Sequence, residues 1–389
     1  GDITLNTVTA GAQVIANNGA TAGSRILDSG VLTVSGTSSF TTVANSGVIT
    51  LDLAHALTGA VTLNTKSSNT SAHATLDNGT TALNIATSSV GGTLTLTSGN
   101  ASGITDSGNV TVGVNFVATT DADDGVITMD TLKVDGTIAL NPHGTGAVTI
   151  VNDVGLNLAA STMGGTFSGT ATAGDISDSG NLVITGAATF ITTAAGRDII
   201  LDQSGNVFTS TVTMQAGNGS NAAFDDITFV DSAAVRLHSS AASAGDLYIN
   251  ASTDGAVGGD LSITATTGNI TQGAAVVVTG TTTLKATTSN DITLDNTSNN
   301  FQGAVKITSG NDVTLVDAGD IDLGASTVSG TYAVTATSGD ITDSGTLTIT
   351  GASIFTTRVG GSNIVLDSSA NAFAAAVTMK ADTGGDETF

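Results

Sequence analysis

Apolar and polar residues alternate in short segments along the chain, and Gly, Asn, Asp and Ser separate these segments. Leucine alternates with threonine in residues 93–97, and residues 346–350 repeat the alternation with Leu347 and Ile349 on one side. A period of two with β-branched residues is typical of a strand that buries one face. No window shows the apolar spacing of an amphipathic helix. The pattern therefore predicts an all-β fold of short strands and turns.

A longer motif, Gly-Asp-Ile-Thr-Asp-Ser-Gly at residues 339–345, recurs with variations. Its anchoring isoleucines are Ile26, Ile104, Ile176, Ile270 and Ile341. A second isoleucine follows each anchor at a nearly constant step, at Ile49, Ile127, Ile199, Ile292 and Ile364. Self-similarity at a fixed period indicates a solenoid built from stacked repeats. We therefore expect about 23 residues per coil, with matching side chains aligned as apolar ladders in the interior.

The anchors also define a longer repeat of three to four coils. The spacings from Ile104 to Ile176 and from Ile270 to Ile341 are the shortest and are close to three coils. The spacing from Ile176 to Ile270 contains one extra coil, which we place among residues 218–250, and a loop at residues 64–73 explains the excess in the first spacing. The prediction is one continuous β-solenoid over residues 1–389, divided into a partial repeat 1–22, long repeats 23–100, 101–173, 174–267 and 268–338, and a partial repeat 339–389.

The acidic composition narrows the range of partners. The chain has nine Lys and Arg against 33 Asp and Glu, and its formal net charge is −24. Nucleic acid is excluded as a partner because no basic stripe is present to neutralise phosphates. Membrane insertion of this segment is not expected, since no apolar run approaches the roughly 20 residues that span a bilayer. The absence of cysteine excludes disulfides and thiolate metal sites.

Clusters of aspartate are the candidate metal sites. The predicted Ca²⁺ ligands are Asp121, Asp123 and Asp124, and a second cluster comprises Asp317, Asp320 and Asp322. Ca²⁺ prefers oxygen ligands, so three carboxylates at this spacing could share one ion. The alternative is that all six are solvated aspartates in turns, a common place for this residue. No catalytic residue and no other cofactor is predicted.

Phenylalanine recurs at matching positions of the repeats. The set is Phe40, Phe190, Phe208, Phe301, Phe355 and Phe373. We interpret these side chains as rungs of the core ladder, not as a track for stacking a ligand.

The repeat can also be compared with a known family. The runs Gly-Asp-Ile-Thr-x-Ser-Gly, x-Leu-Thr-Ile-Thr-Gly, Asn-Asp-Ile-Thr-Leu-Asp and Gly-Ala-Val-x-Ile-Thr follow one another, and this order resembles bacterial filamentous-haemagglutinin-like repeat proteins. These are large secreted or surface adhesins. The resemblance covers nearly the whole chain but involves scaffold positions only, so no binding residue is carried over. It implies a right-handed parallel β-helix, export by a two-partner or autotransporter route, an extracellular or cell-surface location, and a structural or adhesive role.

Together these observations predict a structural, adhesive extracellular protein that forms a rigid stalk or filament segment of a large bacterial surface protein and is not an enzyme. Two alternatives stay open: a self-assembling filament or sheath subunit, and a carbohydrate-active β-helix enzyme, the latter by analogy of fold. The expected partners are further copies of the repeat or of the chain itself, end to end, and cell-surface glycans or a host or neighbouring cell surface.

Overall fold

The chain forms an all-β parallel β-solenoid, as the sequence predicts. The computed structural model describes residues 1–19, 21–217, 225–238, 246–249, 256–257, 259–382 and 387–388. It contains about 16 turns of roughly 22 residues each. The turns group into two compact units, Gly1–Thr189 (unit 1) and Phe190–Phe389 (unit 2). Each unit is described by itself.

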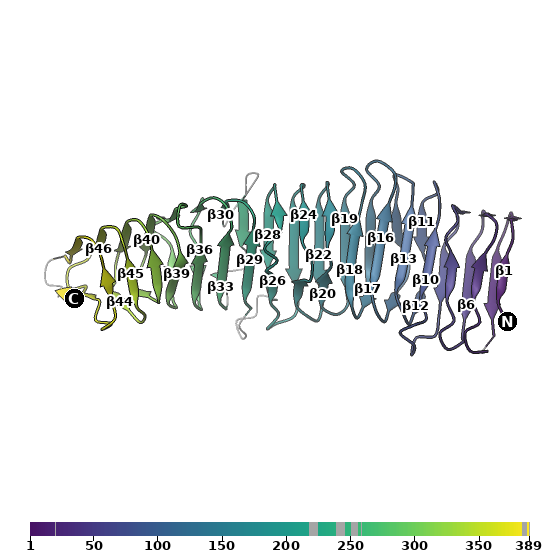
Figure 1. The fold of residues 1–389 in the computed structure, drawn as a ribbon, viewed down its shortest axis with the longest axis horizontal. Coiled ribbons are helices and arrows are strands. Elements are labelled where there is room, and N and C mark those ends of the chain that lie inside the picture. The colour runs from purple at the N-terminus through teal and green to yellow at the C-terminus, as the bar shows by residue number, and fades with distance from the viewer. Residues whose placement is uncertain are drawn as a thin grey trace. The chain divides into compact units, whose positions relative to one another are not determined.

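In unit 1 the strands of successive coils stack in three sets (Figure 1). The first sheet holds β1 (Ile3–Leu5), β4 (Ile26–Asp28), β7 (Ile49–Leu51), β10 (Ala74–Asp77), β13 (Leu94–Ser98), β16 (Phe116–Thr120), β18 (Thr137–Asn141), β20 (Leu156–Leu158) and β23 (Ile176–Asp178). The second sheet holds β3 (Val14–Asn18), β6 (Ser38–Thr42), β9 (Val61–Asn64), β11 (Leu83–Ile85), β12 (Ser88–Val90), β14 (Ile104–Asp106), β15 (Val110–Val112), β17 (Ile127–Val134), β19 (Val148–Asn152) and β22 (Phe167–Ala171). Short strands close the third side: β2 (Val8–Ala10), β5 (Leu32–Val34) and β8 (Ala56–Leu57), and further along β21 (Ser161–Met163) and β24 (Leu182–Ile184). β25 (Ala188–Thr192) leads into unit 2.

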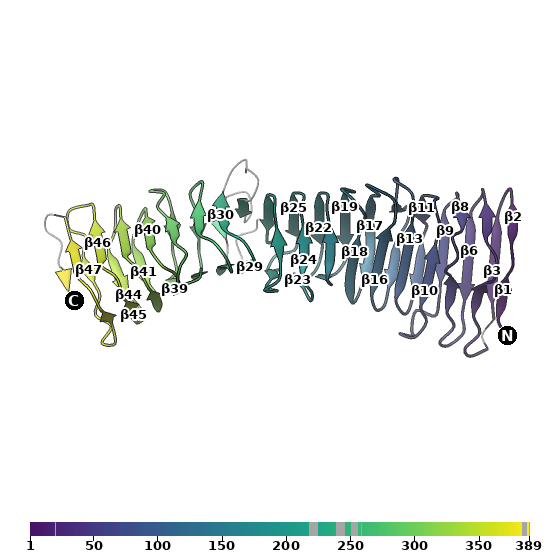
Figure 2. The same ribbon diagram turned by 45° about the horizontal axis from the view of Figure 1, so that its top comes forward.

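Unit 2 repeats the plan (Figure 2). Its first sheet holds β26 (Ile199–Leu201), β29 (Ile227–Asp231), β33 (Leu261–Ala265), β36 (Thr282–Lys285), β39 (Val305–Ser309), β41 (Ile321–Leu323), β44 (Ile341–Asp343), β47 (Ile364–Val365) and β50 (Glu387–Thr388). Its second sheet holds β28 (Val212–Gln215), β30 (Val235–His238), β31 (Asp246–Ile249), β34 (Ile270–Gln272), β37 (Ile292–Leu294), β40 (Val313–Asp317), β43 (Tyr332–Ala336), β46 (Ser353–Thr357) and β49 (Val377–Lys380). The third side holds β27 (Val207–Phe208), β32 (Ala256–Val257), β35 (Val277–Val278), β38 (Asn300–Phe301), β42 (Ser326–Val328), β45 (Leu347–Ile349) and β48 (Ala372–Phe373).

The predicted coil period is confirmed by the strand register. Ile26 of β4 pairs with Ile3 below it and with Ile49 above it, in parallel strands. In unit 2, Ile341 pairs with Ile364 in the same way. One lap of the chain therefore returns equivalent side chains to the same column. Because adjacent parallel strands share backbone hydrogen bonds, every coil is fixed by its neighbours.

The five anchoring isoleucines are not equivalent positions, and the structure corrects this part of the sequence interpretation. In unit 1, Ile26 and Ile176 lie on the first sheet, whereas Ile104 lies on the second. In unit 2, Ile341 lies on the first sheet and Ile270 on the second. The sides of a coil have similar lengths and the same alternation of buried and outward residues, so the motif fits either sheet. Spacings that join anchors on different sheets therefore do not correspond to a whole number of coils.

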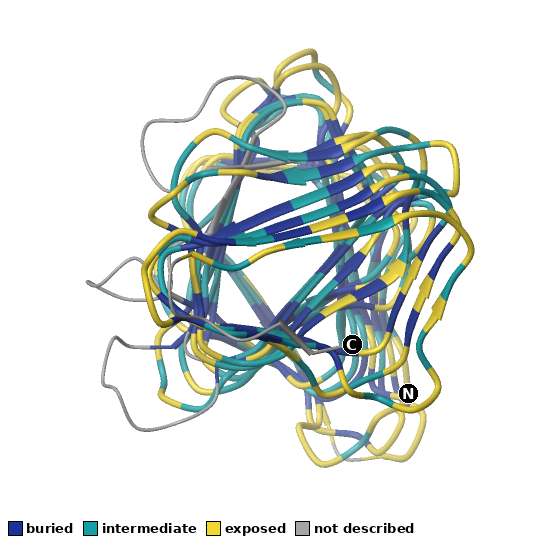
Figure 3. Ribbon diagram, turned by 90° about the vertical axis from the view of Figure 1, so that its left-hand side faces the viewer, coloured by how far each residue is buried: buried dark blue, intermediate teal, exposed yellow. Residues whose placement is uncertain are grey.

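The core follows the period-two pattern. In β13, Leu94, Leu96 and Ser98 are buried, while Thr95 and Thr97 are half-buried and face outward. Figure 3 shows buried and intermediate positions alternating along the strands, and exposed positions mainly at the turns. Each buried leucine or isoleucine stabilises the fold by about 1.5–3 kcal/mol relative to an exposed one. The apolar ladders thus form one interior along each unit.

Phenylalanine occupies the core, but in two columns instead of one. Phe40 and Phe355 lie on second sheets, whereas Phe301 and Phe373 lie on the third side of unit 2. Within unit 2, the ring of Phe355 contacts those of Tyr332 and Phe373 edge to face, at centroid distances of 5.9 and 6.2 Å. Phe190 contacts Phe208 in the same geometry at 6.2 Å. Five of the six phenylalanines are buried, and Phe373 is half-buried.

Glycine is required at one corner of the coil because neighbouring backbones approach closely. A Cβ atom on Gly59 would lie 2.2 Å from the carbonyl oxygen of Gly36 one coil below, and one on Gly351 would lie 2.2 Å from that of Gly330. No side chain fits at such a distance without displacing the backbone. These glycines are therefore needed for the coils to stack at the strand spacing of about 4.8 Å.

The two predicted insertions have different outcomes. Residues 65–73 connect β9 to β10, in agreement with the predicted loop at residues 64–73. For the extra coil, β29 lies between β26 and β33 in the first sheet, so the interval that begins at Ile176 holds three first-sheet steps. The interval that begins at Ile26 also holds three, through β7, β10 and β13, so the described strands show longer coils here and not the predicted additional one. The rest of that prediction falls largely on residues 218–224, 239–245 and 250, which lie outside the described residues.

Candidate functional site

The aspartate that precedes the anchoring isoleucine caps the strand of the next coil. The Oδ1 atom of Asp320 accepts a hydrogen bond of 2.7 Å from the backbone N–H of Asp340. The Oδ1 atom of Asp340 in turn accepts one of 2.6 Å from the N–H of Asn363. Each carboxylate thus binds a donor that lies one coil further along the chain. In these coils the motif Asp-Ile therefore supplies both a cap and a core residue.

The second aspartate of the motif has the same role at the other end of the strand. The Oδ1 atom of Asp343 accepts the N–H of Asp367 at 2.9 Å, and its Oδ2 atom accepts the side-chain amide of Asn371 at 2.6 Å. In unit 1, Asp28 accepts the N–H of Leu53 at 2.9 Å. Asp28 and Asp343 both lie at corners of the coil, where aspartate is common. Their carboxylates do not simply face solvent, because each accepts a backbone N–H of the following coil.

Replacing Asp340 with alanine should lower the free energy of unfolding by about 1 kcal/mol, because a charge-assisted hydrogen bond at a partly exposed strand end is lost. Asp340→Asn retains an oxygen acceptor, so its effect should be smaller. Hydrogen exchange at the Asn363 amide measures the effect locally. Unchanged protection of that amide in Asp340→Ala would contradict the capping role.

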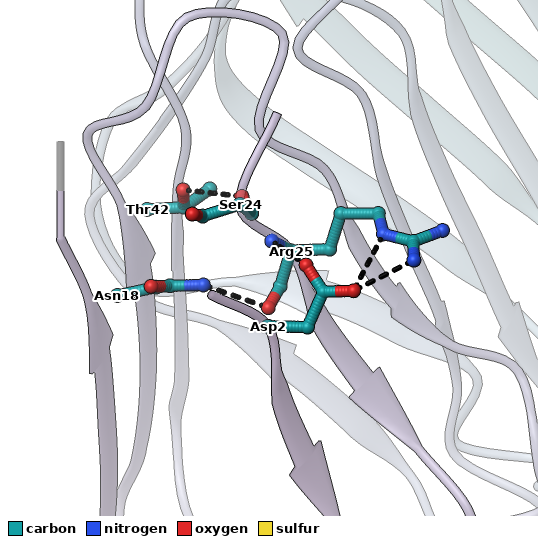
Figure 4. Close-up of polar contacts among 5 residues, drawn as sticks. All are labelled: Asp2, Asn18, Ser24, Arg25 and Thr42. Carbon is teal, nitrogen blue, oxygen red and sulfur yellow. Dashed lines mark hydrogen bonds and ion pairs between the residues drawn. The ribbon is translucent and has the colours of Figure 1, made fainter. Parts of the chain in front are cut away.

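The corner at Asp2 shows how one coil holds the next (Figure 4). The backbone N–H of Arg25 donates to Asp2 Oδ1 at 3.0 Å, and the Nη2 atom of its guanidinium lies 2.6 Å from Asp2 Oδ2. The hydrogen bond from the Arg25 side chain holds the pKa of the Asp2 carboxyl below its ordinary value. From inside, the amide of Asn18 donates to the carbonyl oxygen of Arg25 at 2.7 Å. Asp2 and Arg25 are therefore part of the stacking framework.

Asparagines with buried side chains form a second set of inter-coil contacts in unit 1. The Oδ1 atom of Asn78 accepts the N–H of Leu57 at 2.8 Å, and its Nδ2 atom donates to the carbonyl oxygens of Leu57, Thr81 and Ala82. Asn152 contacts the N–H and carbonyl of Val134 in the same way. Both asparagines are fully buried. Each satisfies backbone groups at a bend, where the strand ladder alone leaves them without partners.

His55 takes the place of such an asparagine one coil earlier. Its Nδ1 atom accepts the N–H of Leu32 at 3.0 Å, which places the ring proton on Nε2. The Nε2 atom lies 2.9 Å from Asp28 Oδ2, and both side chains are almost completely buried. Burial lowers the pKa of His55, and the nearby Asp28 carboxylate opposes part of that effect. Through these contacts His55 joins its coil to the coil of Asp28 and Leu32.

The lowered pKa of His55 predicts a loss of stability in mild acid. The folded chain favours the neutral ring, so this stabilisation is present above the unfolded pKa of about 6.5 and is lost as the pH falls below it. Protonation of Nδ1 would also place an N–H group against the N–H of Leu32. Chemical unfolding of unit 1 between about pH 7 and pH 5 should show this decline. His55→Asn should reduce it, whereas substitution of the exposed His143 should not.

The first group of aspartates predicted as calcium ligands contacts separate partners. Asp124 adopts a left-handed backbone with φ of 60°, and its Oδ1 atom accepts the N–H and hydroxyl of Thr145 at 2.7 and 2.6 Å. The Oδ1 atom of Asp123 lies 2.8 Å from His143 Nδ1. The remaining member of the group, Asp121, donates its N–H to the carbonyl of Ser98.

The second aspartate cluster is also divided between separate partners. Asp317 is buried, which raises its pKa, and accepts the N–H groups of Phe301 and Gly319. Asp320 caps Asp340, and Asp322 accepts the hydroxyl of Ser344 at 2.7 Å. Within the described residues, no group of three or more His, Cys, Asp or Glu is placed to hold a metal ion. Calcium binding at Asp121, Asp123 and Asp124 stays a prediction without a formed cluster.

A groove lined by both polar and apolar groups lies on the outer face of unit 1. It has a volume of about 340 Å³, and we call it the β17 groove. Its lining residues are Asn109, Thr111, Asp130, Thr131, Leu132, Lys133, Val151, Asp153 and Thr172. These residues belong to or directly flank the second-sheet strands β15, β17, β19 and β22, so the groove runs across four successive coils.

A β-bulge in β17 shapes the floor of this groove. The register against β19 shifts between Met129 and Leu132, which leaves one extra residue in β17. Asp106 from the previous coil holds the bulge: its carboxylate accepts the N–H of Asp130 at 3.1 Å and both the N–H and hydroxyl of Thr131, at 2.9 and 2.7 Å. The motif aspartate therefore also fixes the local distortion at the groove.

Comparison with protein families gives a match over most of the chain. A family model for repeats of unknown function (DUF5649) matches residues 1–64, 145–215, 225–308 and 310–380. The chain belongs to this repeat family. No protein of curated function and no solved structure matches the chain. Two of the DUF5649 segments, 145–215 and 310–380, have the same length as the spacing from Ile270 to Ile341, the shortest between anchoring isoleucines.

Several residues that organise the DUF5649 solenoid were missed from the sequence. Asn78 lies in an Asp-Asn-Gly run, which is typical of an exposed turn. Nothing in the sequence distinguishes this asparagine from those at the surface. His55 shares no spacing with other histidines. The groove depends on a one-residue bulge, whose trace in the sequence is a break in the apolar–polar alternation, with the two polar residues Asp130 and Thr131 in succession. Among the described residues, no helix is long and apolar enough to cross a membrane.

Proposed function

We propose that this chain is a structural segment of a large extracellular bacterial surface protein, in which stacked coils act as a stiff spacer and adhesive scaffold. The observation that supports it best is the coil-to-coil register. Each coil is bound to the next by parallel strand ladders, as at Ile3, Ile26 and Ile49, and by aspartate caps such as Asp340. A repeat of this kind resists extension one coil at a time.

The charge of the chain is consistent with that role. A formal net charge of −24 keeps the surface solvated and opposes nonspecific association with nucleic acid and anionic lipid. The described polar networks at His55 and at the corner aspartates join one coil to another. We assign them to stability and not to catalysis.

Single-molecule pulling tests the mechanical part of the proposal. Release of one coil of roughly 22 residues should add about 75 Å of contour length, so force peaks should be separated by that increment or its multiples. Unfolding of each unit in one step, with no smaller increments, would argue against coil-wise resistance.

Immunogold labelling of intact producing cells tests the location. Antibodies against the chain should label the outer surface without permeabilisation. Labelling that appears only after permeabilisation would contradict an extracellular role.

A further inference from the structure

The β17 groove combines several kinds of hydrogen-bonding group in one depression. Asn109 contributes an amide, three threonines contribute hydroxyls, Asp130 and Asp153 contribute carboxylates, and Lys133 contributes an ammonium group. All the charged members are exposed. Within the described residues Lys133 forms no ion pair, although the register places it on the strand beside Asp153. Its donors are therefore available to a bound molecule.

Four of these side chains form one row across the coils. Thr111 pairs with Lys133 in the register of β15 and β17. Lys133 and Asp153 directly follow the paired residues Leu132 and Asn152, and Thr172 donates its hydroxyl to Asp153 Oδ1 at 3.2 Å. Adjacent strands are about 4.8 Å apart, so the row spans about 14 Å along the stacking direction. The length that each pyranose ring adds to a linear saccharide is similar to the spacing between adjacent coils of the solenoid.

The charges limit the class of ligand. Polyanions are disfavoured by the two carboxylates and by the net charge of the chain. Lys133, in the middle of the row, places a like charge beside a bound polycation. The lining also offers apolar surface, from Val151, Leu132 and the carbon atoms of the threonine and lysine side chains, against which the C–H face of a ligand can pack. Hydroxyl groups both donate to carboxylate and amide oxygens and accept from lysine, amide and threonine.

We propose that the β17 groove binds a neutral linear oligosaccharide, with successive rings over successive coils of β15, β17, β19 and β22. Lys133 donates to ring or hydroxyl oxygens, and Asp130 and Asp153 accept hydroxyl protons. This inference goes beyond the proposed structural role, which holds whether or not the groove is occupied.

Titration of the full chain with neutral tetrasaccharides tests the proposal. The probes are cellotetraose, xylotetraose and N-acetylated chitotetraose, with tetragalacturonate and spermine as charged comparisons, followed by saturation-transfer NMR and calorimetry. At least one neutral probe should bind more tightly than both charged molecules. Tighter binding of tetragalacturonate or spermine than of every neutral probe overturns the proposal, as does the absence of binding by all three neutral probes.

Matched variants on β19 locate the site. Val151 and Thr149 both face outward from this strand and are both half-buried, but only Val151 lines the groove. Val151→Phe should fill the groove and weaken binding at least tenfold, whereas Thr149→Phe should leave it unchanged. Equal binding by the two variants places the saccharide elsewhere and overturns the assignment. Circular dichroism confirms folding, and Thr111→Phe replaces Val151→Phe if the latter does not fold.

Discussion

Replacement of Leu96 with alanine is expected to lower the free energy of unfolding by about 2–5 kcal/mol. Leu96 is fully buried and lies in one ladder with Leu76 below it and Ala118 above it. The truncation removes apolar contacts to both neighbouring coils and leaves a cavity that the stacked backbones cannot close, because their ladders fix the spacing. Denaturant unfolding monitored by far-UV circular dichroism measures the change.

Thr95→Ala is the matched control, since Thr95 lies on the same strand and faces outward. Its effect should stay within about 0.5 kcal/mol. Because a stacked array can open locally, hydrogen exchange over residues 74–120 should accompany the global measurement. Similar losses for Leu96→Ala and Thr95→Ala would show that Leu96 is not part of an interior ladder.

Asn78→Ala is expected to cost about 3–5 kcal/mol, because several buried polar groups lose their partner at once. The side chain makes four hydrogen bonds in a fully buried position, and its removal leaves the Leu57 N–H and three carbonyl oxygens to find other partners. Each buried polar group left unsatisfied costs about 1–3 kcal/mol, and partial relaxation reduces the sum. The unfolding free energy and the exchange rate of the Leu57 amide both report the loss.

Asn78→Asp separates the two halves of this network. It retains an oxygen acceptor for Leu57 but loses the amide donor and brings a charge towards carbonyl oxygens, so it should be no more stable than the alanine variant. Asn100→Ala serves as the control, because Asn100 lies at a half-exposed turn where water replaces the hydrogen bonds of its side chain. Equal losses of unfolding free energy for Asn100→Ala and Asn78→Ala would show that the burial of Asn78 does not increase the contribution of its hydrogen bonds to stability.

The coil period could be read from the sequence because the core permits few residue types at its inward positions. Isoleucines one coil period apart, such as Ile26 and Ile49, proved to be register partners. The sheet on which each copy of the motif lies could not be predicted from the sequence, because all sides of the coil share the same alternation of buried and outward residues. Ile104 therefore resembles Ile26 in sequence while lying on the other sheet.

The polar framework was less accessible to sequence reasoning. An aspartate that caps the next coil, such as Asp340, and an aspartate that simply faces solvent in a turn have the same local sequence. The difference is made by a donor in the following coil, whose position depends on the stacking itself. The β17 groove could not be predicted from the sequence for a similar reason. It forms where one extra residue in β17, held by Asp106, shifts that strand against β19.

Disulfide trapping tests the register most directly, and the absence of native cysteine makes the result unambiguous. Thr75 and Thr95 are paired outward residues on adjacent coils, so the double variant Thr75→Cys, Thr95→Cys places two thiols within reach of a disulfide. Thr97 is two positions out of register, at a Cα separation of about 8 Å from Thr75, which exceeds the span of a disulfide. The account predicts rapid oxidation of the 75–95 pair and little oxidation of the 75–97 pair. Preferential oxidation of the 75–97 pair would contradict it.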